Sequence, residues 1–125
     1  MSMSRTKLLT FLRQLHQQRR AMMRRLTRDQ ELALGTVSMV YRKCGNPRCH
    51  CVEGRGHPQT LFLFKDEQQG RRRCKLVRRE DEVRMNRAGQ RYRQFRDDLK
   101  KLRAIDKEEK RILMALAKGR AIRYQ

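Results

Sequence analysis

Three cysteines lie within eight residues near the middle of the chain, in the segment Cys-Gly-Asn-Pro-Arg-Cys-His-Cys that starts at Cys44 and ends at Cys51. Four residues separate Cys44 from Cys49, and one residue separates Cys49 from Cys51. The Gly-Asn-Pro sequence between the first two cysteines is suited to bending the backbone. Three thiolates on such a bent loop can converge on one metal ion, so the segment predicts a zinc knuckle.

Zinc in structural sites takes four tetrahedral ligands from Cys and His, so a fourth ligand is expected nearby. His50 lies between two of the cysteines and should point away from an ion that they share. His57 ends the same loop, whereas Cys74 would face Leu61 across a hairpin if the intervening turn is symmetric. His57 and Cys74 both remain candidates. Four protein ligands would close the coordination shell, which predicts structural rather than catalytic zinc.

The composition leaves little material for a hydrophobic core. Of 125 residues, 38% are hydrophobic and 37% are charged, and 33 Lys plus Arg against 13 Asp plus Glu give a net charge of +20. A large catalytic domain is therefore not expected, and the charge favours a polyanionic partner, nucleic acid above all. No apolar run approaches the length of a membrane span or resembles a signal peptide. We expect a cytoplasmic protein with reduced thiols and no membrane partner.

Periodicity predicts an α+β fold in a single domain over residues 1–125. Apolar residues recur at helical spacing in two long segments, and at spacings typical of strands between them. The expected elements are a helix at 4–34 with Ser4 as its N-cap and Gly35 as its stop, strands at 36–42, 59–65 and 71–77, a Cys-rich loop at 43–58, a helix at 80–117 and a flexible tail at 118–125. Val37, Met39 and Tyr41 should face the core, and the second strand should be covered on both faces.

The simplest way to bury the two helical stripes is an antiparallel pair. Asp106 and Glu109 fall at two successive core positions of the second helix, so a regular coiled coil should not continue past Leu102.

Basic residues are spread over the whole chain, so folded surfaces rather than a tail should be electropositive. One group is expected at one end of the sheet beside the loop, and a second group recurs at helical spacing on the first helix. The predicted nucleic-acid contacts are Arg42, Lys43, Arg48, Arg55, Arg71, Arg72, Arg73, Arg13, Arg20 and Arg24. No base-reading motif appears, so phosphate contacts and strong salt dependence are expected.

The segment from Thr36 to Cys51, followed by Gly54 and Gly56-His57-Pro58, resembles a family of small basic bacterial proteins of unknown function. Members are often encoded beside transposases or integrases of mobile elements. Their pattern is Cys-Gly-x-Pro-x-Cys-x-Cys, then His-Gly-Pro before an aromatic strand, and the resemblance covers about residues 30–105. It implies Cys44, Cys49, Cys51 and His57 as ligands. This chain departs from the pattern at His57-Pro58, which lacks the intervening Gly, and at Leu61-Phe62, where the family has clustered aromatic residues.

Together these features predict a non-enzymatic, zinc-stapled nucleic-acid-binding accessory protein, with DNA favoured over RNA. The resemblance implies assistance to a recombinase or transposase, and a nucleoid location. Two alternatives use the same features: an adaptor whose helices dock onto a partner protein, and an RNA- or ribosome-associated protein. No set of catalytic motifs is visible, and Tyr41 or Tyr92 as a strand-cleaving nucleophile would lack matching partners.

Overall fold

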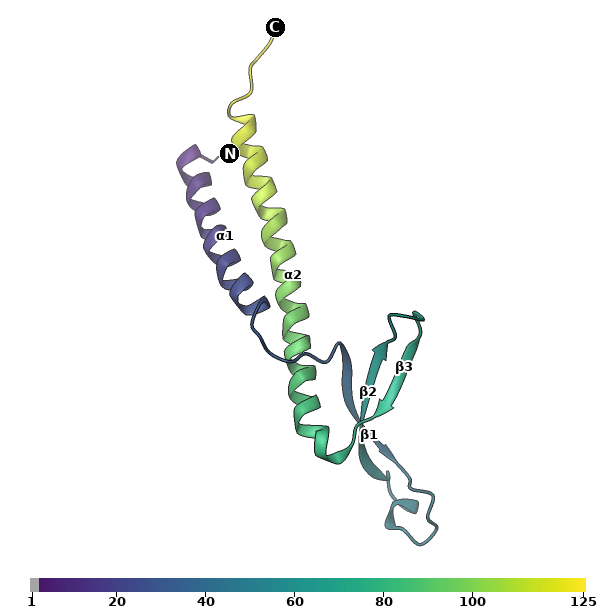
Figure 1. Ribbon diagram of the computed structural model, residues 1–125. Coiled ribbons are helices and arrows are strands. Elements are labelled where there is room, and N and C mark those ends of the chain that lie inside the picture. The colour runs from purple at the N-terminus through teal and green to yellow at the C-terminus, as the bar shows by residue number, and fades with distance from the viewer. Residues whose placement is uncertain (1–2) are drawn as a thin grey trace. The chain divides into compact units, whose positions relative to one another are not determined.

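The computed structural model describes residues 3–125 (Figure 1). The chain forms two compact units: the first contains the chain up to Asp29 together with Phe95–Gln125, and the second is Gln30–Gln94. An N-terminal helix, a three-stranded antiparallel sheet and a long C-terminal helix confirm the predicted α+β class. The C-terminal helix contributes residues to both units. That residues 1–125 form a single domain stays a prediction.

The first helix, α1, spans Arg5–Leu26. Ser4 caps it as predicted, because its hydroxyl oxygen accepts a hydrogen bond from the Lys7 amide at 3.3 Å. The prediction that the helix continues to residue 34 and stops at Gly35 is wrong, since α1 ends at Leu26 with Thr27 as its C-cap. The apolar stripe gives the reason: residues 27–31 contain no apolar side chain that could hold another helical turn against a neighbour.

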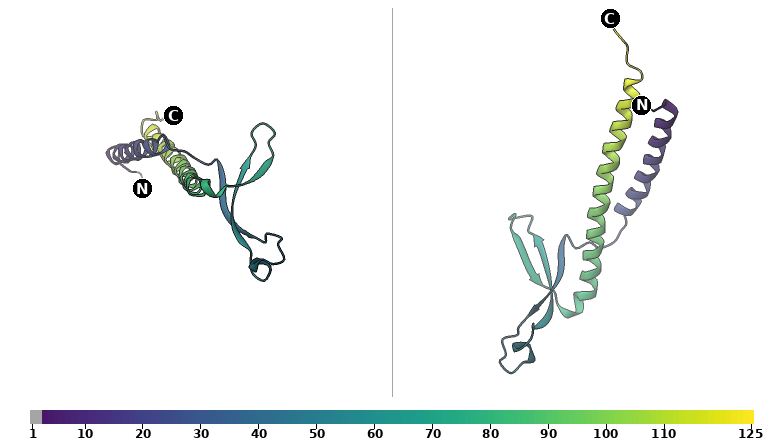
Figure 2. Two further views of the ribbon diagram at one scale, coloured as in Figure 1. Left: turned by 60° about the horizontal axis from the view of Figure 1, so that its bottom comes forward. Right: turned by 180° about the vertical axis from the view of Figure 1, so that it is seen from behind.

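The core of the first unit lies between α1 and the C-terminal part of α2, which spans Glu82–Lys118. The two helices run antiparallel side by side in all views (Figures 1 and 2), as predicted. Leu8 of α1 is buried with Ile112 and Leu116 of α2. Leu9, Leu12 and Leu15 pack against this cluster from α1. The cluster is small, as the composition requires.

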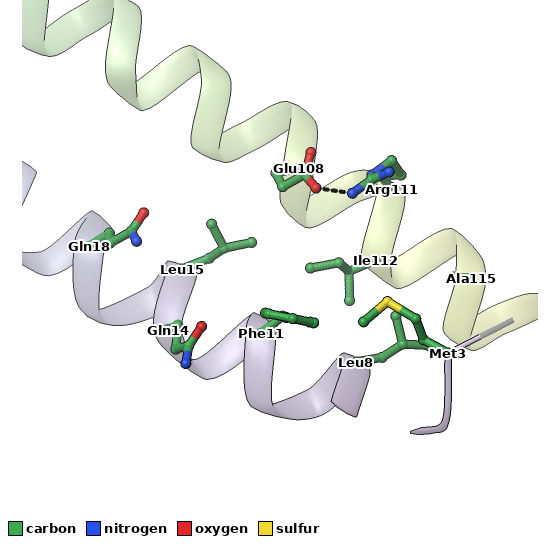
Figure 3. Close-up of a pocket in the computed structure, with 10 residues that line it drawn as sticks. All are labelled: Met3, Leu8, Phe11, Gln14, Leu15, Gln18, Glu108, Arg111, Ile112 and Ala115. Atoms are coloured by element: carbon green, nitrogen blue, oxygen red, sulfur yellow. Dashed lines mark hydrogen bonds and ion pairs between the residues drawn. The ribbon is translucent and has the colours of Figure 1, made fainter. Parts of the chain in front are cut away.

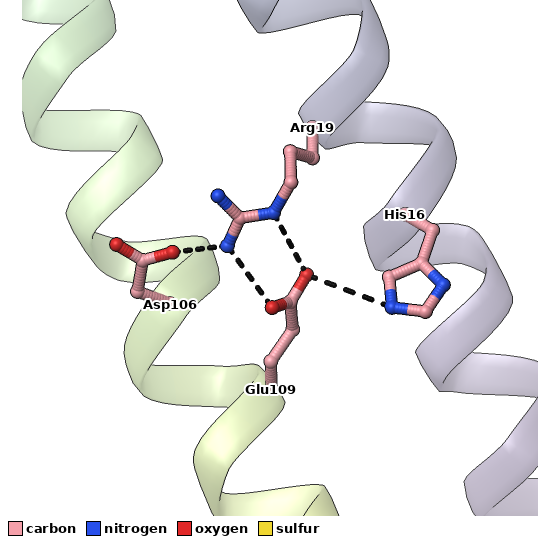
Figure 4. Close-up of polar contacts among 4 residues, drawn as sticks. All are labelled: His16, Arg19, Asp106 and Glu109. Carbon is pink, nitrogen blue, oxygen red and sulfur yellow. Dashed lines mark hydrogen bonds and ion pairs between the residues drawn. The ribbon is translucent and has the colours of Figure 1, made fainter.

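An ion-pair network crosses the same helical pair (Figure 4). The Arg19 guanidinium donates to both carboxylate oxygens of Glu109, at 3.2 and 3.0 Å, and also to Asp106. His16 Nε2 lies 4.0 Å from Glu109 Oε1. Hydrogen bonds to Glu109 and then to Asp106 raise the pKa of Arg19. The two acids that interrupt the heptad pattern therefore have a partner on α1, which periodicity alone did not reveal.

A second interhelical ion pair joins Arg25 of α1 to Asp98 of α2 at 3.0 Å. The Asp98 side chain is only 3% exposed. A buried carboxylate is costly without partners, so this pair helps to fix how the two helices align rather than adding much net stability.

The sheet of the second unit has the order β1-β2-β3, with β1 at Gly35–Arg42, β2 at His57–Lys65 and β3 at Arg72–Leu76. The three strands match the predicted ones to within two residues at each end. The register opposes Arg42 to His57 at one end of the β1–β2 ladder. It opposes Leu63 to Cys74 in the β2–β3 ladder, so the predicted placement of Cys74 opposite Leu61 is wrong.

One face of the sheet packs against the first turns of α2. An added Cβ on Gly89 would lie 2.9 Å from Val37 Cγ2, so only glycine permits this approach of helix and strand. Farther along β1, Met39 is 60% exposed and Tyr41 is 41% exposed, which contradicts their predicted place in the core. Leu63 of β2 is 43% exposed, so this strand is not covered on both faces.

After β3, a 3₁₀ turn at Arg79–Asp81 leads into α2, which ends one residue after the predicted limit. Residues 121–125 adopt no regular structure. Among the helices of residues 3–125, none combines the length and the apolar character that crossing a bilayer demands.

Replacing Gly89 with Leu should lower the free energy of unfolding by about 2 kcal/mol, because the new side chain would overlap Val37. Thermal or urea denaturation measures the change. Gln90→Leu, an exposed position in the same helix, is the matched control and should remain close to wild type. Equal stability of the two variants would show that Val37 does not limit the space at Gly89.

Candidate metal centre

The Cys-rich loop connects β1 to β2 and occupies residues 43–56. Its two ends are held together because Arg42 and His57 are opposed in the ladder. His57 was predicted to lie within the loop, but it is the first residue of β2. The sheet therefore fixes the backbone of His57, and its imidazole can meet side chains of the loop.

Local hydrogen bonds bend the first half of the loop. Gly45 has a φ of 82°, a conformation that favours glycine. The Asn46 side-chain oxygen accepts from the Arg48 amide at 3.0 Å, and the Asn46 carbonyl accepts from the Cys49 amide at 3.0 Å. This turn folds Cys49 back toward Cys44, as the Gly-Asn-Pro sequence predicted.

The second half of the loop is equally constrained. A 3₁₀ turn at His50–Val52 follows Cys49 and buries Cys51. Gly56 has a φ of 95°, and an added Cβ there would lie 2.5 Å from the carbonyl carbon and oxygen of Arg42. Glycine at this position lets the returning chain touch the end of β1. The loop is thus closed at its base directly before His57.

Four donor atoms converge inside this loop: the Sγ atoms of Cys44, Cys49 and Cys51 and one imidazole nitrogen of His57, all within 4.8 Å of one another. Cys44 Sγ lies 3.5 Å from Cys51 Sγ, and Cys49 Sγ lies 3.0 Å from His57 Nε2. A tetrahedral zinc ion would separate sulfurs by about 3.8 Å, and sulfur from nitrogen by about 3.6 Å. The group can therefore hold a metal ion after small side-chain movements.

The electrostatics of the cluster favour a cation. The Cys51 amide, followed by His57, lowers the pKa of Cys49 to about 6, so this thiol is largely a thiolate at neutral pH. The Cys49 thiolate, followed by Cys44, raises the pKa of His57. For Cys51 the Cys44 amide acts to lower the pKa, but burial and the neighbouring thiols outweigh it and the pKa is raised. Sulfurs crowded in this way gain a common partner when a divalent ion replaces their protons.

The structure leaves Cys74 outside this group. Cys74 is opposed to Leu63, six residues along β2 from His57 and hence about 20 Å from the loop. It is exposed on the edge strand and cannot be the fourth ligand in this arrangement. His50 also lies outside the group, as expected from its place between two cysteines.

Cationic side chains surround the loop. Arg55 stacks on the exposed ring of Tyr41, with its guanidinium carbon 4.3 Å from the ring centroid. Lys43 Nζ donates to the Val52 carbonyl at 2.9 Å and so braces the loop.

Within residues 3–125, the side chains of Arg42 and Arg48 form no ion pair or hydrogen bond and are exposed. We call Arg42, Arg48 and Arg55 the knuckle surface. The Arg55–Tyr41 contact was missed because Tyr41 was assigned to the core.

The predicted single cluster of arginines at one end of the sheet is wrong. Arg72 is opposed to Lys65, eight residues along β2 from His57, which corresponds to about 26 Å. Arg71 and Arg73 flank it at the same far end, and Arg73 forms an ion pair with Asp66 at 3.4 Å. The sheet therefore carries separate cationic groups at its two ends.

The predicted strip on α1 consists of Arg13, Arg20 and Arg24, which recur at i, i+7 and i+11 and so share one helix face. All three are exposed, and none has an ion partner in the part of the chain that the structure describes. Arg19 and Arg25, in contrast, are engaged by acids of α2.

Comparison with known proteins places the chain in an uncharacterised family. Residues 12–87 match the model of a domain of unknown function, DUF6788, so the chain belongs to this family. The match includes the whole sheet and all four members of the thiol and imidazole cluster. No curated protein and no solved structure matches the chain.

Replacing Cys49 with Ser should abolish stoichiometric binding of zinc and lower the melting temperature by about 10 °C, which corresponds to about 2 kcal/mol for a domain of this size. Cys74→Ser, outside the cluster, should retain both properties. Metal analysis of purified protein and thermal denaturation measure the two effects.

His57→Ala and His50→Ala form a second matched pair, of which only His57→Ala should lose metal. A wild type that is metal-free after zinc supplementation, and equally stable, would contradict the assignment.

Proposed function

We propose that this protein binds nucleic acid through the knuckle surface, which a structural zinc ion holds in shape. The observation that carries the proposal is the position of Arg42, Arg48 and Arg55 around the four-donor loop, where all three are exposed and have no acidic partner among residues 3–125. Guanidinium groups bind phosphate oxygens through paired hydrogen bonds, and a stiff loop reduces the entropy lost when they do so.

Zinc is the proposed metal because the donor set is three sulfurs and one imidazole nitrogen, a combination typical of structural zinc sites. Four protein ligands leave no open coordination position for substrate or water. The proposal is therefore a non-enzymatic role, in which the metal stabilises a binding surface.

Electrostatics provide further support. The net charge is +20, and the cationic strip of Arg13, Arg20 and Arg24 on α1 offers a second surface for phosphates. We propose duplex DNA as the preferred ligand, in an accessory role for a recombinase or transposase and with a nucleoid location in the cytoplasm. That context rests on the resemblance to bacterial proteins of mobile elements. RNA is the alternative that the experiment below distinguishes.

The proposal predicts that changing Arg42, Arg48 and Arg55 together to Gln weakens binding to duplex DNA at least 10-fold. Each lost phosphate contact should reduce the slope of log K against log salt by about 0.9, so the slope should fall by about 2 to 3. Fluorescence anisotropy of metal-loaded protein across a salt series, with matched duplex DNA, single-stranded DNA and structured RNA, measures both quantities.

The matched control changes Arg103, Lys107 and Lys110 of α2 to Gln, which removes the same charge from exposed positions elsewhere. This control should bind duplex DNA within about twofold of the wild-type affinity. Its slope of log K against log salt should differ from the wild-type slope by less than about 0.9, the value expected for one phosphate contact. Equal losses in the two variants would show that charge alone, and not the knuckle surface, governs binding. Tighter binding to structured RNA than to duplex DNA would replace DNA by RNA as the ligand.

A further inference from the structure

An apolar groove runs along the helical pair of the first unit (Figure 3). One section has a volume of about 590 Å³ and includes Leu8, Phe11 and Ile112 in its lining. An adjoining section of about 430 Å³ includes Met22 and Ile105. Leu15, Gln18 and Glu108 line both sections, so the two form one continuous groove.

The dimensions of the groove suit an α-helix. On α1 the lining residues Phe11, Leu15, Gln18 and Met22 are spaced i, i+4, i+7 and i+11, which is a single stripe. The lining of α2 extends from Lys101 to Ala115, which corresponds to about 21 Å, or four helical turns. Phe11 is 43% exposed in this groove, so a large apolar side chain lacks cover.

Small side chains on α2 allow another helix to approach it closely. Ala104 and Ala115 line the groove on this helix, and both are exposed. A bulky helix can therefore lie against α2 while it contacts Phe11 and Leu15 of α1.

The border of the groove on the α2 side is cationic. Beside Ala104 and Ala115, exposed basic residues of α2 recur at i, i+7, i+11 and i+18 and so share the adjacent helix face: Lys100, Lys107, Arg111 and Lys118. Among the described residues that line the groove, Glu108 is the one acid, and it forms an ion pair with Arg111. The first unit as a whole contains 18 basic and six acidic side chains.

We propose that this groove binds an amphipathic α-helix of a partner protein, one that has an apolar stripe flanked by Asp and Glu. The apolar floor matches the stripe, and the cationic border on α2 matches the acidic residues on the flank that faces it, as in the pairing of charged residues beside the core of coiled coils. A second copy of this chain fits less well because it would bring a further excess of positive charge to the same border. Nucleic acid offers no apolar surface of this width. The inference is independent of the proposed nucleic-acid function.

The test uses a synthetic helical peptide of about 21 residues, with Leu at i, i+4, i+7 and i+11 positions and Glu on both flanks. A scrambled peptide of the same composition, in which the Leu residues form no stripe, controls for attraction by charge alone. Isothermal titration calorimetry with full-length protein measures affinity and stoichiometry. The striped peptide should bind one-to-one and at least 10-fold more tightly than the scrambled one.

Two variants locate the peptide. Ala115→Glu places a carboxylate in the groove, whereas Ala117→Glu places the same charge on the same helix at an exposed position outside the groove lining. Both retain a good helix-forming residue, so both should fold, which circular dichroism verifies. Ala115→Glu should lower the affinity of the protein for the striped peptide at least 10-fold. Ala117→Glu should change this affinity less than twofold.

Three results would overturn the proposal. The first is equal binding of the striped and scrambled peptides, and the second is equal affinity of the two variants. The third is a wild-type dimer in analytical ultracentrifugation that Ala115→Glu alone converts to a monomer, which would identify a second copy of the chain as the occupant. A monomeric wild type at the concentrations of the titration agrees with the proposal.

Discussion

The convergence of three thiols and one imidazole at the base of the β1–β2 loop is the constraint on which the second unit depends. Its buried hydrophobic residues are Ala33, Cys51 and Ala88, all of them small, so this unit has little apolar core. The loop is ordered instead by turns, by two glycines with positive φ and by the donor cluster. A metal ion bound there would add binding free energy to folding free energy, as in other small domains that metals stabilise.

The distribution of acids decides which cations are free. Glu109 and Asp106 engage Arg19, Asp98 engages Arg25, and Glu31 engages Arg84. These four carboxylates link helix to helix, or the segment before β1 to α2, whereas Asp66, Glu80, Asp81 and Glu108 pair with exposed arginines of the surface. Because basic residues far outnumber the acids, positive charge remains on exposed faces such as the knuckle surface, where phosphate is the natural counterion. The same arrangement explains how a chain with net charge +20 aligns its two helices at all.

The cluster could be predicted from sequence because all four donors lie within 14 residues and local turn chemistry brings them together. The exclusion of Cys74 could not be predicted from sequence, because it depends on the register between β2 and β3. That register is set by the hydrogen bonds that close the turn between Asp66 and Gly70. The end of α1 at Leu26 does have a sequence signal, the absence of apolar side chains from residues 27–31, but the signal is weak because polar residues are also compatible with a helix. Periodicity placed Tyr41 in the core because alternation reports which face a residue occupies, not how far the covering helix extends along the strand.

The helical pair of the first unit buries few apolar side chains within the chain. Ion pairs such as Arg19 with Glu109 fix the alignment of the helices, but partly exposed ion pairs contribute little net stability. Leu8, Ile105, Ile112 and Leu116 supply its buried apolar side chains, and Phe11 stays partly exposed beside them. A ligand that binds only the folded state raises stability in proportion to RT ln(1 + [L]/Kd). A helix that fills the groove would therefore stabilise the first unit, as a metal ion would stabilise the second.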